Sequence, residues 1–560
     1  MKKLKIYTTI LASILLLTAC GSSVGVPKND FVTDDNSVEI NLSDEGITVD
    51  QKPVGTNEED AVYTANDIVY YESGKDFTYG EGTEKDAHSA EEAAAHTVVH
   101  ITKAGTYILS GKLSRGQIAV DLGEEAKEDS EAVVTLVLNG LDVTCEVAPA
   151  VIFYNVYECG NADVDNAKKD VDTSAAGANI IIADDTKNII NGSYVERIYK
   201  PGSVVLNDDK TEVEDAKKLH KYDGAFYSKM SMNINGGEEN SGVLTINAEN
   251  EGLDSELHLT INGGIININS GNDGINTNED GVSVTTVNGG VLTITVTGET
   301  GEGDGIDSNG WLVINGGTVV AAACSDSADA GIDSDMGIHI NGGTVAATGH
   351  MLDRIEDGGQ TYAVFQFAKR QDGNVVISLK DAAEKAVMEY APGNAYSVLV
   401  CSSSDLTEGT YTLWSDGKQM AGQSGGMFGG FGMPGGMMPG GEWPEGFEPG
   451  GELPEGFEFG GEWPEGFEPS GEWPEGFEPG GKFPQQKLGN TQGNPQGNPP
   501  SFGGEPPKGM EGFGRPGEGG MWHPGNNSWD AQALTAEFEI VEGGNVFSSV
   551  SFLNESASYN

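Results

Sequence analysis

The sequence predicts an all-β protein whose main part is a parallel β-helix, and three observations lead to this prediction. Asn-Gly-Gly recurs at a nearly constant interval of 26 or 27 residues, at Asn235, Asn262, Asn288, Asn315 and Asn341. Short runs of β-branched residues stand between Gly, Asn and Asp, as in strands joined by tight turns. Glycine is frequent, at 81 of 560 residues, but follows no Gly-X-Y period. A coil of three short strands suits this interval better than a propeller blade, which repeats at roughly 40–50 residues.

The first twenty residues are predicted to be an export signal. Three lysines precede an apolar run over residues 6–17, which is too short to span a bilayer. Leu-Thr-Ala-Cys then ends at Cys20, as in a bacterial lipobox, so we expect a lipid anchor on Cys20. This places the protein on the outer face of the plasma membrane. Residues 21–60 are rich in Asp, Glu, Asn and Ser and are predicted to be a flexible spacer.

Residues 61–350 are predicted to form the parallel β-helix. In each coil one strand precedes the Asn-Gly-Gly corner and a second strand follows it, as at residues 312–314 and 318–320. A third, shorter side carries motifs such as Asp-Gly-Ile-Asp-Ser at residues 304–308. We expect the apolar residues of successive coils to stack inside the helix, and the corner asparagines to stack their amides along its axis.

The repeat ends at about residue 350. Residues 351–420 are predicted to form a small antiparallel β unit that caps the open end of the β-helix. Residues 421–530 hold 33 of the 81 glycines and 17 of the 22 prolines, which predicts a disordered, low-complexity insert with Trp-Pro-Glu-Gly-Phe repeats. Residues 531–560 return to strand character and are predicted to complete the capping unit.

The charge balance excludes one class of partner. Acidic residues number 87 against 31 basic ones, which gives a formal charge of -56 and argues against nucleic-acid binding. Residues 231–349 contain 17 Asp or Glu and no Lys or Arg. The third sides of the coils place four oxygen-bearing residues at equivalent positions, so they should stack about 4.8 Å apart. These residues are Asp254, Asn276, Asp307 and Asp333.

Calcium is the cofactor that this column of oxygens predicts, because calcium takes six to eight oxygen ligands. A plainer interpretation is that Asp and Asn occupy these positions because they suit turns. That interpretation accounts less well for the missing basic residues, so we favour calcium, bound in a way that contributes to folding. The predicted metal ligands are Asp254, Asp273, Asn276, Asp304, Asp307, Asp333 and Asp335.

No catalytic pair stands out in the sequence. Glycoside hydrolysis needs two carboxyl groups at a set separation, and the repeat offers many acids without marking two of them. A lyase acting on uronic acids would need a strong base such as Arg or Lys, which residues 231–349 lack. We therefore predict that the protein is not an enzyme, with a polysaccharide hydrolase that uses an Asp pair as the alternative.

Three segments at the start of the predicted β-helix resemble a known family. Residues 101–113 read Ile-Thr-Lys-Ala-Gly-Thr-Tyr-Ile-Leu-Ser-Gly-Lys-Leu, residues 116–121 read Gly-Gln-Ile-Ala-Val-Asp, and residues 136–145 read Leu-Val-Leu-Asn-Gly-Leu-Asp-Val-Thr-Cys. With the Asn-Gly-Gly and Asp-Gly-Ile-Asp coils, they resemble a bacterial carbohydrate-binding domain family typified by a clostridial lipoprotein. The resemblance covers about residues 60–350, and this chain departs from the family in insertions at residues 161–176 and 200–218.

The resemblance implies a right-handed parallel β-helix similar to the pectate lyase fold, with calcium bound on it. It also implies non-catalytic binding of plant cell-wall polysaccharides, namely cellulose and acidic pectic sugars. Calcium held by protein carboxylates can bridge to the carboxylates of such sugars.

A neutral glucan would instead stack on a flat aromatic ring. Trp311 is the candidate within the repeat, although packing between coils is the plainer role for it. Five of the seven tryptophans lie within residues 421–530, so a structural surface adhesin is a further alternative. The sequence indicates no oligomeric state.

Overall fold

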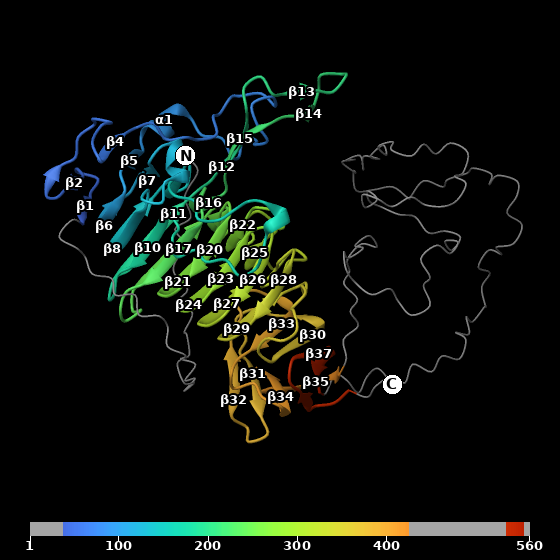
Figure 1. Cartoon of the computed structure of the whole chain (residues 1–560). Coiled ribbons are helices and arrows are strands. Elements are labelled where there is room, and N and C mark those ends of the chain that lie inside the picture. Colours follow the sequence, from blue (N-terminus) through green and yellow to red (C-terminus); the bar gives the residue numbers. More distant parts are fainter. Residues whose placement is uncertain (1–36, 425–533, 554–560) are drawn as a thin grey trace, which may run out of the picture. The chain divides into compact units, whose positions relative to one another are not determined.

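Three runs of parallel strands form most of the protein, in a computed structural model that describes residues 37–424 and 534–553 (Figure 1). In each run, a strand pairs in parallel with the corresponding strand of the next coil. The first run contains, in order of pairing, β6 (Gly105–Leu113), β8 (Val134–Thr144), β10 (Ala178–Ile182), β17 (Met232–Gly236), β20 (His258–Ile261), β23 (Val284–Val287), β26 (Trp311–Ile314) and β28 (Gly337–Ile340).

The second and third runs follow the same rule. The second continues from the far end of β8 through β11 (Lys187–Gly192), β18 (Val243–Ala248), β21 (Ile265–Ser270), β24 (Val291–Val296), β27 (Thr318–Ala322) and β29 (Thr344–Gly349). The third contains β5 (Thr97–Ile101), β7 (Gly116–Asp121), β9 (Val151–Asn155), β16 (Gly224–Ser228), β19 (Glu251–Ser255), β22 (Ile275–Thr277) and β25 (Ile306–Ser308).

The core lies between the three runs and is built from ladders of β-branched residues. Side chains alternate between the two faces of a strand, so residues in parallel register stack on the same face. One such ladder lies in the first run, and each of its members is at most 1% exposed; it consists of Ile180, Ile234, Ile261, Val287, Ile314 and Ile340. Burial of these stacked side chains contributes roughly 1.5–3 kcal/mol per residue, which makes the repeat self-supporting. The prediction of an all-β protein is thus confirmed.

Strands also occupy part of the predicted spacer. β1 (Val38–Leu42) pairs in parallel with β6, and short antiparallel pairings follow through β2 (Thr48–Val49) and β3 (Lys52–Pro53). The prediction of a flexible spacer over residues 21–60 is therefore wrong for residues 38–53, and residues 21–36 lie outside the described part. The physical reason is the alternation in β1, where Ile40 and Leu42 are at most 2% exposed and extend the core.

A short segment before the third run adds the α-helix of the described chain. β4 (Val62–Ala65) pairs antiparallel with β5 at the edge of the third run. α1 (Ala90–Ala94) begins after Ser89, whose hydroxyl accepts a hydrogen bond from the backbone of Glu92 while the Glu92 carboxylate accepts one from the backbone of Ser89. This capping box satisfies two backbone groups of the first turn. No helix in the described part of the chain is long and apolar enough to cross a membrane.

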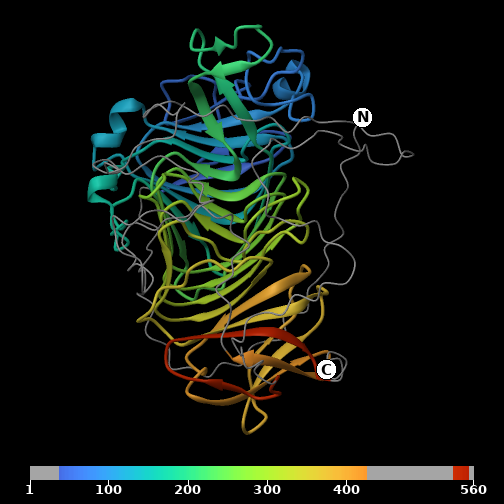
Figure 2. The same ribbon diagram turned by 90° about the vertical axis from the view of Figure 1, so that its right-hand side faces the viewer.

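Two insertions interrupt the coils. The first, at residues 161–176, contains the 3-10 helix η2 (Val164–Asn166), whereas the 3-10 helix η1 (Glu124–Glu128) lies earlier, between β7 and β8. The second pairs β12 (Val195–Tyr199) with β15 (Lys218–Tyr222), and β13 (Val205–Leu206) with β14 (Val213–Asp215), as antiparallel hairpins (Figure 2, green strands at the top).

The chain after residue 350 forms a second β unit with its own core. Its strands are β30 (Tyr362–Gln371), β31 (Ile377–Asp381), β32 (Ala386–Tyr390), β33 (Tyr396–Ser402), β34 (Gly409–Ser415), β35 (Lys418–Ser424), β36 (Phe538–Ile540) and β37 (Gly544–Phe552). β33 pairs antiparallel with β29 and so continues the second run, while β30 pairs in parallel with β37, unlike the wholly antiparallel unit that we predicted. β35 extends to Ser424, so the boundary predicted at residue 421 falls inside a strand. The rest of the predicted insert lies outside the described residues.

Candidate functional site

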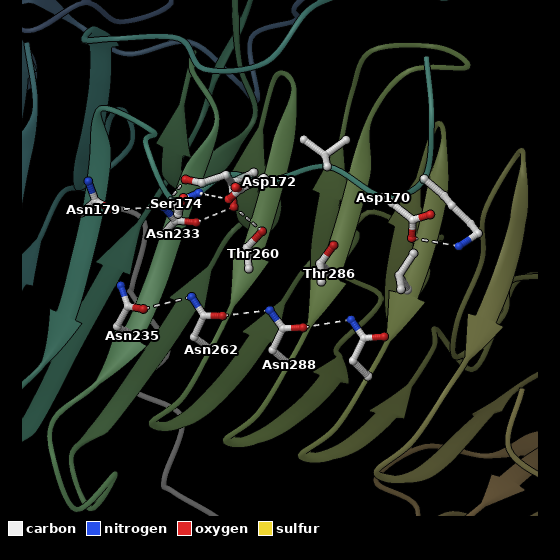
Figure 3. Close-up of a pocket in the computed structure, with 15 residues that line it drawn as sticks. Asp170, Asp172, Ser174, Asn179, Asn233, Asn235, Thr260, Asn262, Thr286 and Asn288 are labelled. Atoms are coloured by element: carbon white, nitrogen blue, oxygen red, sulfur yellow. Dashed lines mark hydrogen bonds and ion pairs between the residues drawn. The ribbon is translucent and has the colours of Figure 1, made fainter. Parts of the chain in front are cut away.

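An open groove of about 570 Å³ lies on the outer face of the first run (Figure 3). Its floor consists of side chains from β10, β17, β20, β23 and β26 and from the corners that follow these strands. Its wall is residues 169–174, which we call the strap. The strap is part of the insertion at residues 161–176 and runs across the strands.

The floor begins with a row of outward-facing side chains in parallel register. Asn179, Asn233, Thr260, Thr286 and Val313 pair in that order, each with the equivalent residue of the next coil. Five coils at the parallel strand spacing of about 4.8 Å give the groove a length of roughly 19 Å. The row therefore presents an amide or a hydroxyl group on four successive coils and ends at the apolar Val313.

A ladder of side-chain amides forms the second row of the floor. Asn262 donates to Asn235 at 3.0 Å, Asn288 to Asn262 at 2.9 Å, Asn315 to Asn288 at 2.9 Å and Asn341 to Asn315 at 2.8 Å, each from Nδ2 to Oδ1 (Figure 3). The predicted stacking of the Asn-Gly-Gly amides is thus confirmed. Because each amide has two donors and a two-lone-pair oxygen, the ladder leaves hydrogen-bonding capacity on the groove side.

The strap is held to the floor at Thr173. The Thr173 hydroxyl lies 2.7 Å from both Oδ1 of Asn233 and Oγ1 of Thr260, and Nδ2 of Asn233 donates to the Thr173 carbonyl at 2.7 Å. Thr173, Asn233 and Thr260 are each at most 6% exposed. This group of buried, hydrogen-bonded polar side chains is costly to separate, because separation would leave buried donors and acceptors unpaired. Thr173 therefore fixes the position of the groove wall.

Three charged residues line the groove, and all belong to the strap. Lys169 Nζ lies 2.8 Å from Asp170 Oδ1, with side chains 37% and 79% exposed, and the third charged residue is Asp172. The groove contains no aromatic side chain among its lining residues. Trp311 is half-buried on β26, two residues before Val313, and is not among them. The groove therefore offers hydrogen bonds and charge rather than stacking.

The predicted column of carboxylates lies on the outer face of the third run. Asp254, Asn276 and Asp307 are in parallel register on β19, β22 and β25. Asp333 continues the column, since its backbone N–H donates to the carbonyl of Ile306 at 2.7 Å. The sequence thus placed these four residues correctly.

The remaining predicted ligands lie beside this column. Asp273 Oδ1 accepts from the backbone N–H of Asp304 at 2.7 Å, and Asp304 Oδ1 accepts from that of Ala330 at 2.5 Å. Each carboxylate therefore ties its coil to the next. Asp335 is exposed at the margin.

Burial and mutual repulsion raise the pKa values of three acids in or beside this column. Burial, followed by the charges of Asp333 and Asp273, raises the pKa of Asp304 to about 9. Burial and the charge of Asp307 raise the pKa of Asp273 to about 7. Burial and the charge of Asp353 likewise raise the pKa of Asp333 to about 7. The column therefore gains from any proton or cation that neutralises it.

The oxygens of the column suit calcium by chemistry but are not assembled around one point. Oδ1 of Asn276 and Oδ1 of Asp333 are buried and make no hydrogen bond, and both are the hard ligands that calcium prefers. Across residues 37–424 and 534–553, no three Asp, Glu, His or Cys side chains converge in a group that would hold a metal ion. Calcium binding at the column would therefore require side chains to rotate.

The sequence did not reveal the groove. Its wall comes from an insertion outside the repeat, and its floor row varies between Asn, Thr and Val. One signal was present, because Asn179, Asn233 and Thr260 each occupy a polar position between two apolar ones on its strand. Such positions face outward in a strand whose apolar residues are buried.

These features define a β-rich protein with a polar groove along stacked coils. Residues 95–359, which contain the groove and the acidic column, match the family described as carbohydrate-binding domain-containing protein. The match spans 265 of the 560 residues and confirms, for this region, the predicted resemblance to a carbohydrate-binding domain.

One solved structure is similar to this chain: "Structure of the polysaccharide lyase-like protein from C. thermocellum, Gadolinium derivative". The identity is 19%, the match covers 55% of this chain and 90% of that chain, and the TM-score is 0.32. No curated protein matches the chain.

Proposed function

We propose that the protein binds polysaccharide in the groove without cleaving it. The observation that carries this proposal is the repetition of amide and hydroxyl groups in the two rows of the groove floor, within a region that matches a carbohydrate-binding family. A polysaccharide repeats its hydroxyl groups along its length, and Asn and Thr side chains both donate to and accept from hydroxyls.

The proposal includes a closed, right-handed parallel β-helix. Its support is that each of the three parallel runs takes one strand from every coil between residues 224 and 308. A right-handed path also follows the usual hand of connections between parallel strands. Such a stack keeps the rows of the groove floor straight.

The ligands that we propose are plant cell-wall polysaccharides, acidic pectic sugars, cellulose, or both. The lining residues favour recognition of ring hydroxyls and charged groups, because they include no aromatic ring for stacking on a sugar face. For Trp311 we propose a role in packing and not in stacking on a sugar.

Calcium dependence is a further part of the proposal. Calcium would be held at the column by Asp254, Asn276, Asp307 and Asp333, with Asp273 and Asp304 beside them. Two unpartnered buried oxygens and the absence of Lys and Arg from residues 231–349 support it. When bound, calcium would supply positive charge that relieves the repulsion between the carboxylates of the column.

We also propose that a lipid on Cys20 anchors the protein to the outer face of the plasma membrane. The lipobox sequence supports this anchor, and Cys20 lies outside the described residues. The adhesin alternative depends on residues 421–530, which lie almost wholly outside the described residues as well.

A pull-down tests the function. The full chain is incubated with insoluble cellulose and with calcium-pectate, with calcium or excess chelator, and the supernatant is assayed for released sugar. Thr286→Trp fills the groove floor, and Thr293→Trp makes the same change on the second run of the same coil. We expect Thr286→Trp to weaken binding about tenfold, as displaced hydrogen bonds of 1–2 kcal/mol would, and Thr293→Trp to bind as the unmodified protein does.

Equal binding by both variants would show that the groove is not the site. Released sugar would show an enzyme instead. The raised pKa of Asp304 gives that alternative one supporting observation, since a general acid must stay protonated near neutral pH. Loss of sugar release in Asp304→Asn would then identify Asp304 as that acid.

A further inference from the structure

We infer that Lys169 makes the groove selective for acidic sugars, by binding a sugar carboxylate directly with its ammonium group. This inference rests on the proposed function, because it concerns the choice of ligand within the same groove. It assigns the recognition of the sugar carboxylate to one residue of the strap.

Charge is the first reason for this assignment. The groove floor comes mostly from residues 231–349, which contain no Lys or Arg, and the whole chain carries a formal charge of -56. A polyuronate therefore meets repulsion over most of the surface. Among the residues that line the groove, Lys169 is the one that carries a positive charge. A carboxylate in the groove would thus find its counter-charge at Lys169.

The position of Lys169 is the second reason. Thr173 fixes the strap over Asn233 and Thr260, near the start of the groove. The strap then runs along the stack to Asp170, the residue next to Lys169 (Figure 3). His339 on β28 is the register neighbour of Val313. Burial, and after it the charge of Lys169, lowers the pKa of His339, so Lys169 lies near it. Lys169 therefore lies above the last coils of the groove.

The ion pair with Asp170 is the third reason, because it shows that the Lys169 ammonium group can bind a carboxylate. The two groups lie 2.8 Å apart and both are substantially exposed. Exposed ion pairs of this kind contribute at most about 1 kcal/mol, so a sugar carboxylate can replace Asp170 at little cost. Asp170 is thus a weak competitor for the place of the ligand.

Variants of the two neighbouring residues should have opposite effects. The probes are a galacturonate oligosaccharide and a neutral cello-oligosaccharide, and affinities for the full chain are measured by titration calorimetry in excess chelator. We expect Lys169→Gln to weaken galacturonate binding about fivefold and Asp170→Asn to strengthen it about threefold, as the loss of one exposed ion pair implies. Binding of the neutral oligosaccharide should stay unchanged in both variants. A misfolded strap would not produce effects of opposite sign.

Lys168→Gln is the matched control, because Lys168 is the exposed neighbour that does not line the groove. It removes the same charge and should leave galacturonate binding as it is, while Lys169→Arg should keep it. If Lys169→Gln binds galacturonate like the unmodified protein, the inference is wrong and the proposed function stands. Galacturonate binding that is present with calcium and lost in chelator would assign recognition to calcium instead. If the unmodified protein binds neither oligosaccharide under any condition, the proposed function itself fails.

Discussion

Single asparagine side chains join the corners of successive coils. The amide of Asn288 donates to Asn262 and accepts from Asn315, both at 2.9 Å, which only a side chain with donor and acceptor at one end can do. Aspartate has no such donor when ionised, so it would end the ladder and repel its neighbours. The recurrence of asparagine at each corner is therefore explained by chemistry and not only by turn preference.

His258 makes the stability of the protein depend on pH. It is 2% exposed, burial lowers its pKa to about 4, and its Nδ1 accepts from the backbone of Val284 at 3.2 Å. The unfolded chain, with a histidine pKa near 6.5, binds more protons between pH 6.5 and 4. The contribution of His258 to stability is therefore complete above pH 6.5 and should fall by about 3 kcal/mol as the pH drops to 4. The raised pKa values of Asp273, Asp304 and Asp333 act in the opposite direction, because these acids favour the folded state more as the pH falls. Urea unfolding at several pH values measures this change.

The variant His258→Asn supplies the control, since its amide oxygen can accept from Val284 and does not titrate. We expect the free energy of unfolding of the unmodified protein, relative to that of the variant, to fall by about 3 kcal/mol between pH 6.5 and 4. The same slope in both proteins would show that other groups, such as His220, carry the dependence; burial also lowers the pKa of His220 to about 4.

At the scale of elements, the strap converts one face of a regular stack into a groove. It is joined to the first run at Thr173, and the hydrogen bonds there link residues 60 and 87 positions apart in sequence. An element fixed at so few points opens locally at a lower free energy than the strands beneath it.

Thr173→Val tests the anchoring of the strap. Valine keeps the shape but removes the hydroxyl that contacts Asn233 and Thr260, so the strap should open about tenfold more often, for a loss of 1–2 kcal/mol. Amide hydrogen exchange over residues 160–176 measures this opening, and the strands of the first run should keep their protection. Ser174→Ala removes a hydroxyl from the exposed neighbour and should change nothing. Unchanged exchange in Thr173→Val would show that other contacts hold the strap.

At the scale of the whole molecule, acidic charge opposes folding. Residues 231–349 place 17 acidic side chains on stacked coils without a basic residue between them. Parallel pairing brings equivalent acids close together, and burial strengthens their repulsion. The fold is therefore expected to be more stable when cations are bound.

Calcium should raise the melting temperature by several degrees, since a ligand at one hundred times its dissociation constant stabilises the folded state by about 2.7 kcal/mol. At pH 8, Asp273→Asn keeps an acceptor for the backbone of Asp304 but removes a charge from beside the column. This variant should melt higher than the unmodified protein in chelator and respond less to calcium. Asp372→Asn, on the exposed surface of the second β unit, should behave like the unmodified protein. A sodium salt of equal ionic strength that gave the same increase would indicate screening and not binding.

The sequence by itself determined the features that depend on recurrence. Asn-Gly-Gly at intervals of 26 or 27 residues predicted the amide ladder, and the equivalent positions of Asp254, Asn276 and Asp307 predicted the acidic column. Parallel pairing places residues that recur once per coil in register, so a period in the sequence becomes a row in space.

Only the tertiary structure decided where the groove lies and what forms its wall. Thr173 meets Asn233 and Thr260 across long stretches of chain, and β1 adds to β6 across more than sixty residues. Neither contact has a period or a local motif, because each results from the way an irregular segment packs on a surface that the coils have already built. The repeat therefore specified the stack, and packing of the segments outside the repeat specified the site.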